Sequence, residues 1–500
     1  MDITVTVTGG EVAGKQNDGV TTFLGIPYAA APVGESTFAA PAPVTPWDGI
    51  RAATTEGPSC WQSAYPEPIN GWFGKVTASQ LGGECLNVNV WTPDVGATDL
   101  PVMVWIHGGA FTRGSNASPM YDGSAFARDG VVLVSINYRL GVFGFLPIDG
   151  APTNLGMRDQ IAALKWVQDN IIQFGGDPRN VTIFGESAGG MSVANLLASP
   201  GARGLFAKAI VQSGHGHSIV EADDARKVTA ELAALLGTSP TAEAFASIDP
   251  ATLIAAQDKI SDEIRQAPDP ARWGATTVSA GGGITGFIPA FDDLIPVFPD
   301  DAVAAGAAGG ISLLAGSTAR EFSLFSTSSG LRGAITQEML PMAVARFGAD
   351  AGVVAAYSAN HPDESAADIF DHIVSDLFFR RPMLTLAHTA GQSGSDVFVY
   401  EFAWGTAVSD LGPCHALELP FVFDAVSGSE SFTGPHPPQR LADDIHAAWV
   451  SFAKTGSPGW PAYADGQAVR VFDAERSTTN PLPRGADIAA LNRDHDIAGA

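Results

Sequence analysis

Six short apolar runs, separated by polar or helical sequence, constrain the fold of this chain most strongly. Most of them are continuous rather than alternating, which is the pattern of parallel strands that are buried on both faces. A helical spacing of three or four residues recurs between them, as in Ile161, Leu164 and Val167. This alternation predicts an α/β fold with a mostly parallel central sheet flanked by helices. The runs cover residues 102–106, 131–136, 181–184, 209–211, 311–315 and 397–402.

No linker and no internal repeat divides the 500 residues, so we expect a single domain over 1–500. The region from about 217 to 310 is rich in Ala, Asp and Pro. We interpret this region, and a second one at about 325–395, as helical insertions over one end of the sheet.

The composition excludes several classes of protein. A hydrophobic content of 45 % with only 16 % charged residues indicates a large core. The net charge of −26 repels phosphate backbones, so we expect no nucleic-acid partner. No apolar run is long enough for a transmembrane segment, and the first residues lack the basic start and apolar stretch of a secretory signal. We therefore expect a cytoplasmic protein; its oligomeric state is not indicated.

Three cysteines are too few for a disulfide scaffold, and no Cys-x-x-Cys or Cys/His cluster predicts a metal site. A bridge between Cys60 and Cys85 would stabilise the fold by roughly 3–4 kcal/mol in an oxidising compartment, which would indicate an exported mature form. Residues 9–16 nearly match a phosphate-binding loop. However, Gln16 replaces the Ser or Thr that would hold magnesium, so a hairpin turn is the better interpretation.

The stretch "VTIFGESAGG" at residues 181–190 carries the first chemical signal. It places a Gly-x-Ser-x-Gly pattern between an apolar strand and a helical sequence, which is the layout of a nucleophile elbow. Ser187 is therefore a candidate nucleophile. The alternative is a small residue at the start of a helix.

An activated serine needs oxyanion donors, a base and a group that orients the base. The sequence "WIHGGAF" at 105–111 follows a strand, so the backbone N–H groups of Gly109 and Ala110, with that of Ala188, are candidate donors. In α/β-hydrolases the acid and the histidine follow late strands, which favours Glu321 and His415. The other histidines are competitors on position alone (His361, His372, His388, His436, His446, His495) or are interpreted as structural or pocket-lining (His107, His215, His217).

Ten motifs follow one another along the chain: "FLGIPYA" (23–29), "GPSC" (57–60), "ECLNVNVWTP" (84–93), "HGGAF" (107–111), "NYRLGVFGFL" (137–146), "NLGMRDQIAALKWVQDNI" (154–171), "FGGDPRNVTIFGESAGG" (174–190), "AGSTARE" (315–321), "CHALELPFVF" (414–423) and "FAKTGSP" (452–458). In this order, the sequence resembles the type-B carboxylesterase family, the α/β-hydrolases that include the cholinesterases. The resemblance implies that Ser187 is the nucleophile, His415 the general base and Glu321 its orienting acid. It implies supporting roles for Glu186 and Ser213.

The resemblance also matches Cys60 and Cys85 to the family's first disulfide loop. Two positions depart from the family pattern, because Arg320 and Phe322 flank Glu321 where the family has Asp and Gly. No tryptophan matches the position that holds a quaternary ammonium group in cholinesterases, so choline specificity is not supported.

These signals together predict a serine carboxylesterase that hydrolyses small-molecule esters through an acyl-enzyme on Ser187, without metal or cofactor. Its activity should fall below roughly pH 6–7, because the histidine must be neutral to act as a base. Two alternatives remain. One is a lipase acting on longer acyl chains, and the other is a non-catalytic binding or adhesion protein on the same fold.

Overall fold

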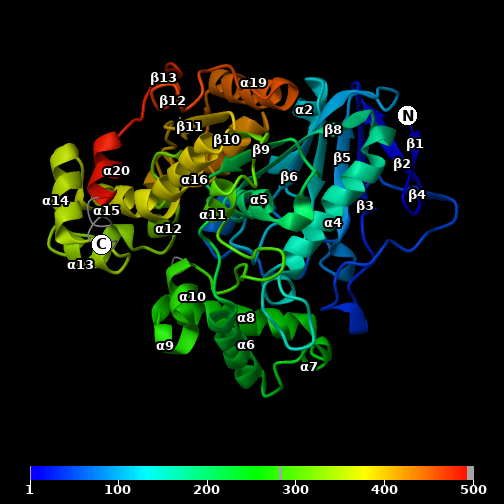
Figure 1. Ribbon diagram of the computed structural model, residues 1–500, viewed down its shortest axis with the longest axis horizontal. Coiled ribbons are helices and arrows are strands. Elements are labelled where there is room, and N and C mark those ends of the chain that lie inside the picture. The colour runs from blue at the N-terminus through cyan, green and yellow to red at the C-terminus, as the bar shows by residue number, and fades with distance from the viewer. Residues whose placement is uncertain (1, 281–283, 493–500) are drawn as a thin grey trace.

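The computed structural model describes residues 2–280 and 284–492, and a single twisted sheet runs through them (Figure 1). Its strands follow the order β1-β2-β3-β5-β7-β6-β8-β9-β10-β11-β12-β13, with β4 paired to β2. The parallel part is formed by β7 (Val132–Ile136), β6 (Leu100–Ile106), β8 (Gly176–Glu186), β9 (Lys208–Gln212), β10 (Ser312–Thr318), β11 (Val397–Phe402) and β12 (Ala468–Phe472).

All six apolar runs lie in this parallel part, which confirms the prediction of a mostly parallel sheet. The prediction about residues 9–16 was partly wrong. A hairpin is present, but its turn lies at Thr8 and Gly9, and most of the stretch belongs to a strand. The remaining strands, mostly antiparallel, lie toward the two edges: β1 (Asp2–Val7), β2 (Gly10–Asn17), β3 (Val20–Pro27), β4 (Ile50–Ala52), β5 (Asn87–Thr92) and β13 (Thr478–Pro481).

Alternate residues of β6 face two separate cores, one on each side of the sheet. Val102 and Val104 pack on the side covered by α4 (Leu155–Asn170), α5 (Ala188–Ala198) and α16 (Arg381–Gln392). Met103 and Trp105 pack on the side covered by α2 (Ser124–Arg128) and α19 (Gln439–Thr455). A strand enclosed on both faces has no polar side, which explains its continuous apolar sequence.

The two segments interpreted as insertions are helical, and parts of them project away from the sheet (Figure 1). Two of their helices instead pack back onto the sheet layer: α11 (Pro299–Ala304) against α5 and α16, and α16 against β10 and β11. The other helices of the first segment are α6 (Ala222–Leu236), α7 (Ala242–Ala246), α8 (Pro250–Gln266), α9 (Pro270–Trp273) and α10 (Ala275–Ala280). Those of the second are α12 (Ser323–Ser328), α13 (Leu340–Ala345), α14 (Ala351–Asn360) and α15 (Ala366–Ser375).

The remaining helices are α1 (Ile69–Phe73), α3 (Gly141–Gly144), α17 (Leu419–Val422), α18 (Glu430–Thr433) and α20 (Gly485–Asn492). None of the helices in the described residues has the length and apolar character that would carry it across a bilayer.

A disulfide joins Cys60 and Cys85, both buried, across 25 residues of sequence. Changing both to alanine is expected to lower the free energy of unfolding by about 3 kcal/mol, because the unfolded chain regains the entropy of an open loop. Urea denaturation of the oxidised wild type and the double variant measures this difference. Equal midpoints and slopes for the two proteins would contradict it.

Candidate active site

Ser187 occupies the turn between β8 and α5, in a backbone conformation (φ 56°, ψ −124°) that side-chain-bearing residues rarely adopt. The glycines around it leave the space for this turn. A Cβ atom on Gly189 would lie 2.0 Å from the carbonyl oxygen of Ile106, and one on Gly185 would lie 2.5 Å from the carbonyl carbon of Gly189. The side chain of Ser187 is partly exposed at the end of the parallel strands, although its neighbours are buried. The sequence pattern therefore folds as the predicted elbow.

The loop that follows β6 lies against this elbow. A Cβ atom on Gly108 would approach the Cβ of Ser187 to 3.2 Å, so only glycine keeps the space above the serine open. Gly109 and Ala110 both have positive φ angles, 109° and 53°. Among the described residues, the backbone N–H groups of Gly109, Ala110 and Ala188 have no acceptor. Three free donors therefore border the serine, as an oxyanion site requires.

His415 and Glu321 form a buried pair on two loops that follow β11 and β10. Nδ1 of His415 lies 2.5 Å from Oε2 of Glu321. The other oxygen, Oε1, accepts from the hydroxyl of Ser213 (2.6 Å) and from the backbone N–H of Thr318 (2.7 Å). With both oxygens engaged, the carboxylate holds the imidazole with its proton on Nδ1 and leaves Nε2 available.

The two residues that depart from the family pattern point away from Glu321's carboxylate. Arg320 forms an ion pair with Asp368 at 2.7 Å. Phe322 packs its ring against Phe347 and Phe370, and its backbone N–H donates to a serine hydroxyl. The unusual flanking residues are thus used to attach the helices of the second segment.

The structure does not join Ser187 and His415 by a hydrogen bond. Nε2 of His415 lies 3.1 Å from Oε1 of Glu186, the residue before the serine, in a charge contact without hydrogen-bond alignment. The hydroxyl of Ser187 donates to no group in the described part of the chain. Such bonds are often absent before substrate binds and form in the complex.

Three buried carboxyl groups surround the imidazole of His415. Burial raises the pKa of Glu186 to about 8 and that of Glu418 to about 7, because like charges and low polarity disfavour ionisation. For His415 itself, burial alone would lower the pKa, but the charges of Glu186 and Glu321 outweigh it and raise the pKa to about 9. Glu418 was not identified from the sequence, although it lies three residues after His415; its carboxylate accepts from Gln212.

The competing histidines are placed elsewhere. His107 stacks on Tyr138, and burial lowers its pKa to about 4, which fits the structural role expected for it. His446 bonds to a backbone carbonyl inside the second core. His215 is buried, and its neighbour His217 pairs with Asp300 at 2.5 Å. His388 and His436 are exposed, His361 and His372 approach a glutamate remote in sequence from the elbow, and His495 lies outside the described residues.

Two aromatic rings contact the imidazole of His415. The ring centroids of Phe325 and Phe379 lie 5.2 Å and 4.9 Å from it. Phe379 belongs to a π-helical turn (Asp376–Arg380) whose position could not be derived from local sequence.

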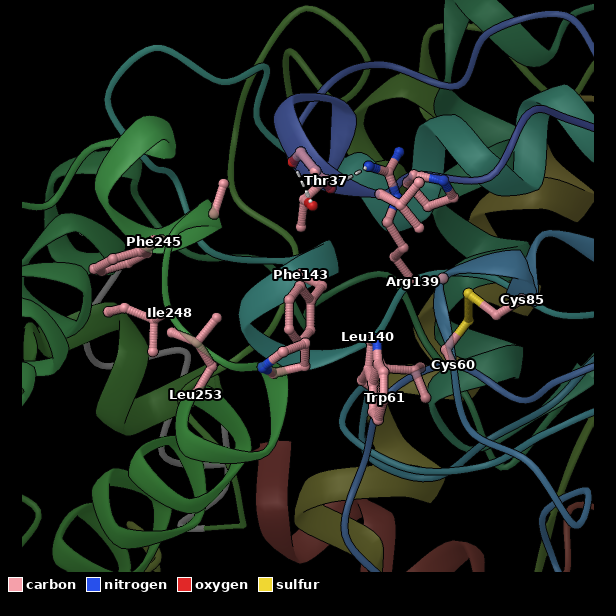
Figure 2. Close-up of a pocket in the computed structure, with 16 residues that line it drawn as sticks. Thr37, Cys60, Trp61, Cys85, Arg139, Leu140, Phe143, Phe245, Ile248 and Leu253 are labelled. Atoms are coloured by element: carbon pink, nitrogen blue, oxygen red, sulfur yellow. Dashed lines mark hydrogen bonds between the residues drawn. A yellow bond between two sulfur atoms is a disulfide. The ribbon is translucent and has the colours of Figure 1, made fainter.

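A separate cavity of about 250 Å³ lies between the disulfide and helices α7 and α8 (Figure 2). It is lined by Trp61, Phe143 and Leu253 among others, and by neither Ser187 nor His415. It is therefore distinct from the site of the serine, and it contributes no group to the chemistry there.

Substitution of Gly109 by alanine is expected to lower kcat about 100- to 1,000-fold, the usual effect of losing one oxyanion donor. A Cβ atom there would lie 2.2 Å from the carbonyl oxygen of Arg113, so the loop must move. Initial rates on p-nitrophenyl butyrate measure the loss. Gly204→Ala is the matched control, because Gly204 also has a positive φ but no atom within 4 Å of the added Cβ. Equal rates in the two variants would contradict the role of the loop.

Comparison with known proteins shows full-length similarity to one family. The model of the carboxylesterase family matches residues 1–480. The chain is 38 % identical to the para-nitrobenzyl esterase of Bacillus subtilis (95 % of this chain, 96 % of that one) and 33 % identical to the phenmedipham hydrolase of Pseudarthrobacter oxydans (94 % of each). Its structure is similar to those of a PNB esterase (36 % identity, TM-score 0.84, 98 % and 99 % covered) and of a Geobacillus stearothermophilus carboxylesterase (36 %, 0.84, 97 % and 99 %).

Proposed function

This chain belongs to the carboxylesterase family and is a carboxylic ester hydrolase, and we propose that it acts as a single α/β-hydrolase unit through an acyl-enzyme on Ser187. The observation that carries the proposal is the convergence of a strained, accessible serine, three free backbone donors and an oriented histidine at one edge of the sheet.

In the first half-reaction, His415 takes the proton of Ser187 as the oxygen attacks the ester carbonyl. Its Nε2 must turn from Glu186 to the serine when substrate binds. The oxyanion that forms is held by the N–H groups of Gly109, Ala110 and Ala188. His415 then gives its proton to the leaving alcohol. In the second half-reaction, water attacks the acyl-enzyme with the same proton transfers, and neither step needs a metal or cofactor.

The proposed alcohol side of the site is aromatic. Since His415 protonates the leaving oxygen, the alcohol must lie close to its ring, where Phe325 and Phe379 are in contact. This supports a preference for small esters of aromatic alcohols, in keeping with the para-nitrobenzyl substrate in the name of one relative. The expected result is a higher kcat/KM for benzyl butyrate than for ethyl butyrate, and a Phe325→Ala variant that loses this preference. An unchanged ratio of the two kcat/KM values in the variant would show that the aromatic contact of Phe325 does not cause the preference.

The rates on dissolved and on emulsified esters distinguish a carboxylesterase from a lipase. A carboxylesterase should reach its full rate on dissolved p-nitrophenyl butyrate and gain nothing when long-chain esters form an emulsion. A rate that rises only above the solubility limit would assign the protein to the lipases. Absence of turnover on every ester, in a folded sample, would favour a binding protein on the same fold.

The raised pKa of His415 changes the expected pH profile. The neutral imidazole is the active form, so kcat/KM should fall as the pH decreases through about 9, rather than through the pH 6–7 expected from the sequence. Glu186→Gln removes the negative charge beside Nε2 of His415, which lowers the pKa of the histidine. The decline in kcat/KM should therefore move to lower pH. Initial rates between pH 5 and 10 measure both profiles. An identical midpoint in the variant would show that Glu186 does not control the histidine.

A further inference from the structure

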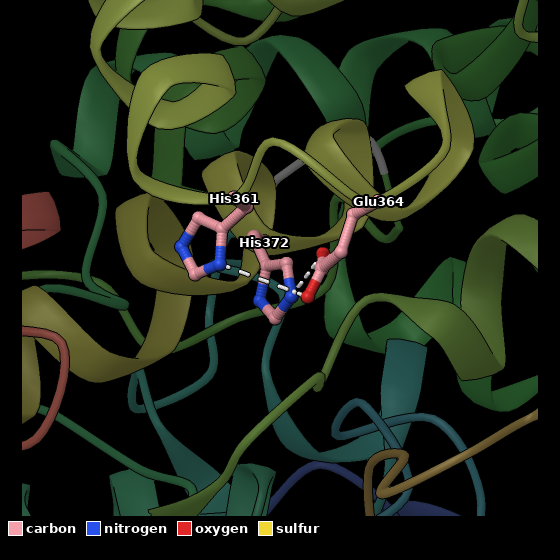
Figure 3. Close-up of side chains that lie close together, drawn as sticks. All are labelled: His361, Glu364 and His372. Carbon is pink, nitrogen blue, oxygen red and sulfur yellow. Dashed lines mark ion pairs between the residues drawn. The ribbon is translucent and has the colours of Figure 1, made fainter.

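Two histidines and a glutamate meet on the helical segment formed by α14 and α15, apart from the residues of the ester site (Figure 3). His361 follows the end of α14, Glu364 lies in the connecting loop and His372 lies inside α15. Nδ1 of His361 is 3.6 Å from one oxygen of Glu364, and Nε2 of His372 is 2.9 Å from the other. In the part of the chain that the structure describes, this is the one group of three or more His, Cys, Asp or Glu residues whose possible ligand atoms all lie within 4.8 Å of one another.

We propose that His361, Glu364 and His372 bind a divalent transition-metal ion of the zinc class. Two imidazoles and one carboxylate form a recurrent zinc ligand set, and a water completes the tetrahedron. With bonds of about 2.0–2.2 Å, the ligand atoms of such a site lie about 3.3 Å apart. The candidate ligand atoms here lie within 4.8 Å of one another, so they must move closer together around an ion. The side chain of Glu364 is 36 % exposed, so an ion and its water reach the site from solvent.

A carboxylate behind His361 gives independent support. Oδ2 of Asp487 lies 2.8 Å from Nε2 of His361, and Oδ1 of the same buried group accepts from Asn360 at 2.6 Å. This carboxylate fixes the proton of His361 on Nε2 and directs the lone pair of Nδ1 toward Glu364. Metal-binding histidines characteristically have such a partner on the nitrogen that does not bind the ion.

Binding requires two adjustments. The rings of His361 and His372 are stacked with 13° between their planes and 4.9 Å between centroids, so both planes cannot contain one ion until one ring rotates. The side chain of His361 is 15 % exposed and that of His372 is 10 % exposed, so the rotation takes place among packed neighbours. Nε2 of His372 must also lose the proton it shares with Glu364. That proton moves to Nδ1 of His372, which lies 3.3 Å from Nη1 of Arg484. Nη1 then keeps its second partner, Asp376.

A bound ion would connect the end of α14 to α15, and the chain that continues from α15 reaches the ester site. Its last ligand lies in α15, which runs directly into the π-helical turn that carries Phe379 beside His415. A bound ion therefore stabilises this segment without taking part in ester cleavage. The sequence predicted no metal site, because that prediction considered cysteine and histidine clusters and not a glutamate between two histidines.

The test is calorimetric titration of the EDTA-treated full-length protein with ZnCl₂, with Co²⁺ absorption as a second readout. We expect one ion per chain, a higher melting temperature with Zn²⁺, and visible bands of tetrahedral Co²⁺. Glu364→Gln and His361→Gln should each weaken binding at least tenfold, and Asp487→Asn about 10- to 100-fold. His388→Gln, at an exposed histidine outside the group, should leave the affinity unchanged.

The absence of binding, or equal affinity in wild type and Glu364→Gln, would overturn the proposal. Glu364 is exposed in the loop between α14 and α15, so Glu364→Gln leaves the packed core unchanged and its affinity decides the matter. Neither result depends on the proposed ester chemistry, because ester turnover is not the readout.

Discussion

Ser187→Ala is expected to lower kcat on p-nitrophenyl butyrate about a millionfold, to the residual rate that binding and the oxyanion donors provide. The physical reason is that Ser187 combines a strained turn, a partly exposed hydroxyl and neighbouring free N–H groups, which an attacking oxygen needs. Initial rates at saturating substrate measure the effect, and circular dichroism shows whether the variant is folded.

Ser247→Ala serves as the matched control, because Ser247 is an exposed serine that bonds only within its own helical turn. Its rate should equal that of the wild type. A Ser187→Ala variant with more than about one hundredth of the wild-type rate would be too active for a chain that has lost its nucleophile.

His415→Gln is expected to have a comparably large effect, because the serine hydroxyl is a weak nucleophile without a base. Glutamine keeps a polar group near Glu321 but cannot accept and return a proton. The Ser187→Ala/His415→Gln double variant should be no slower than either single variant, since the two residues act as one unit. Initial rates of the four proteins form the complete cycle.

Two observations would contradict this prediction. One is a double variant whose loss equals the product of the two single losses, which would mean that the residues act independently. The other is a His388→Gln control that loses as much activity as His415→Gln, although its side chain is exposed and bonds only to Gln392.

The features that could be predicted from the sequence are those that local sterics impose. The elbow requires glycine at 185 and 189, because a Cβ atom at either position would lie within 2.5 Å of backbone atoms. Strand segments enclosed by helices are mostly apolar, so β6 and the part of β8 at 181–184 were visible as continuous runs. Glu321 and His415 were found from their order after late strands, and the structure brings the two together.

The features that could not be predicted depend on contacts between distant segments. The approach of His415 to Glu186, across 229 positions of sequence (415 − 186), has no local pattern. Neither has the packing of Phe379 on the imidazole, because it depends on where α15 ends above the sheet. The outer strand β4 was missed because it is three residues long and exposed throughout, so no apolar run marks it.

The most direct measurement is the mass of the intact protein after treatment with a fluorophosphonate, followed by mapping of the modified peptide. We expect one adduct per chain on the peptide that contains Ser187, loss of ester turnover in proportion to labelling, and no adduct on the Ser187→Ala variant. An adduct on a different residue, or a folded and active protein that takes no label, would contradict the assignment of Ser187 as the nucleophile.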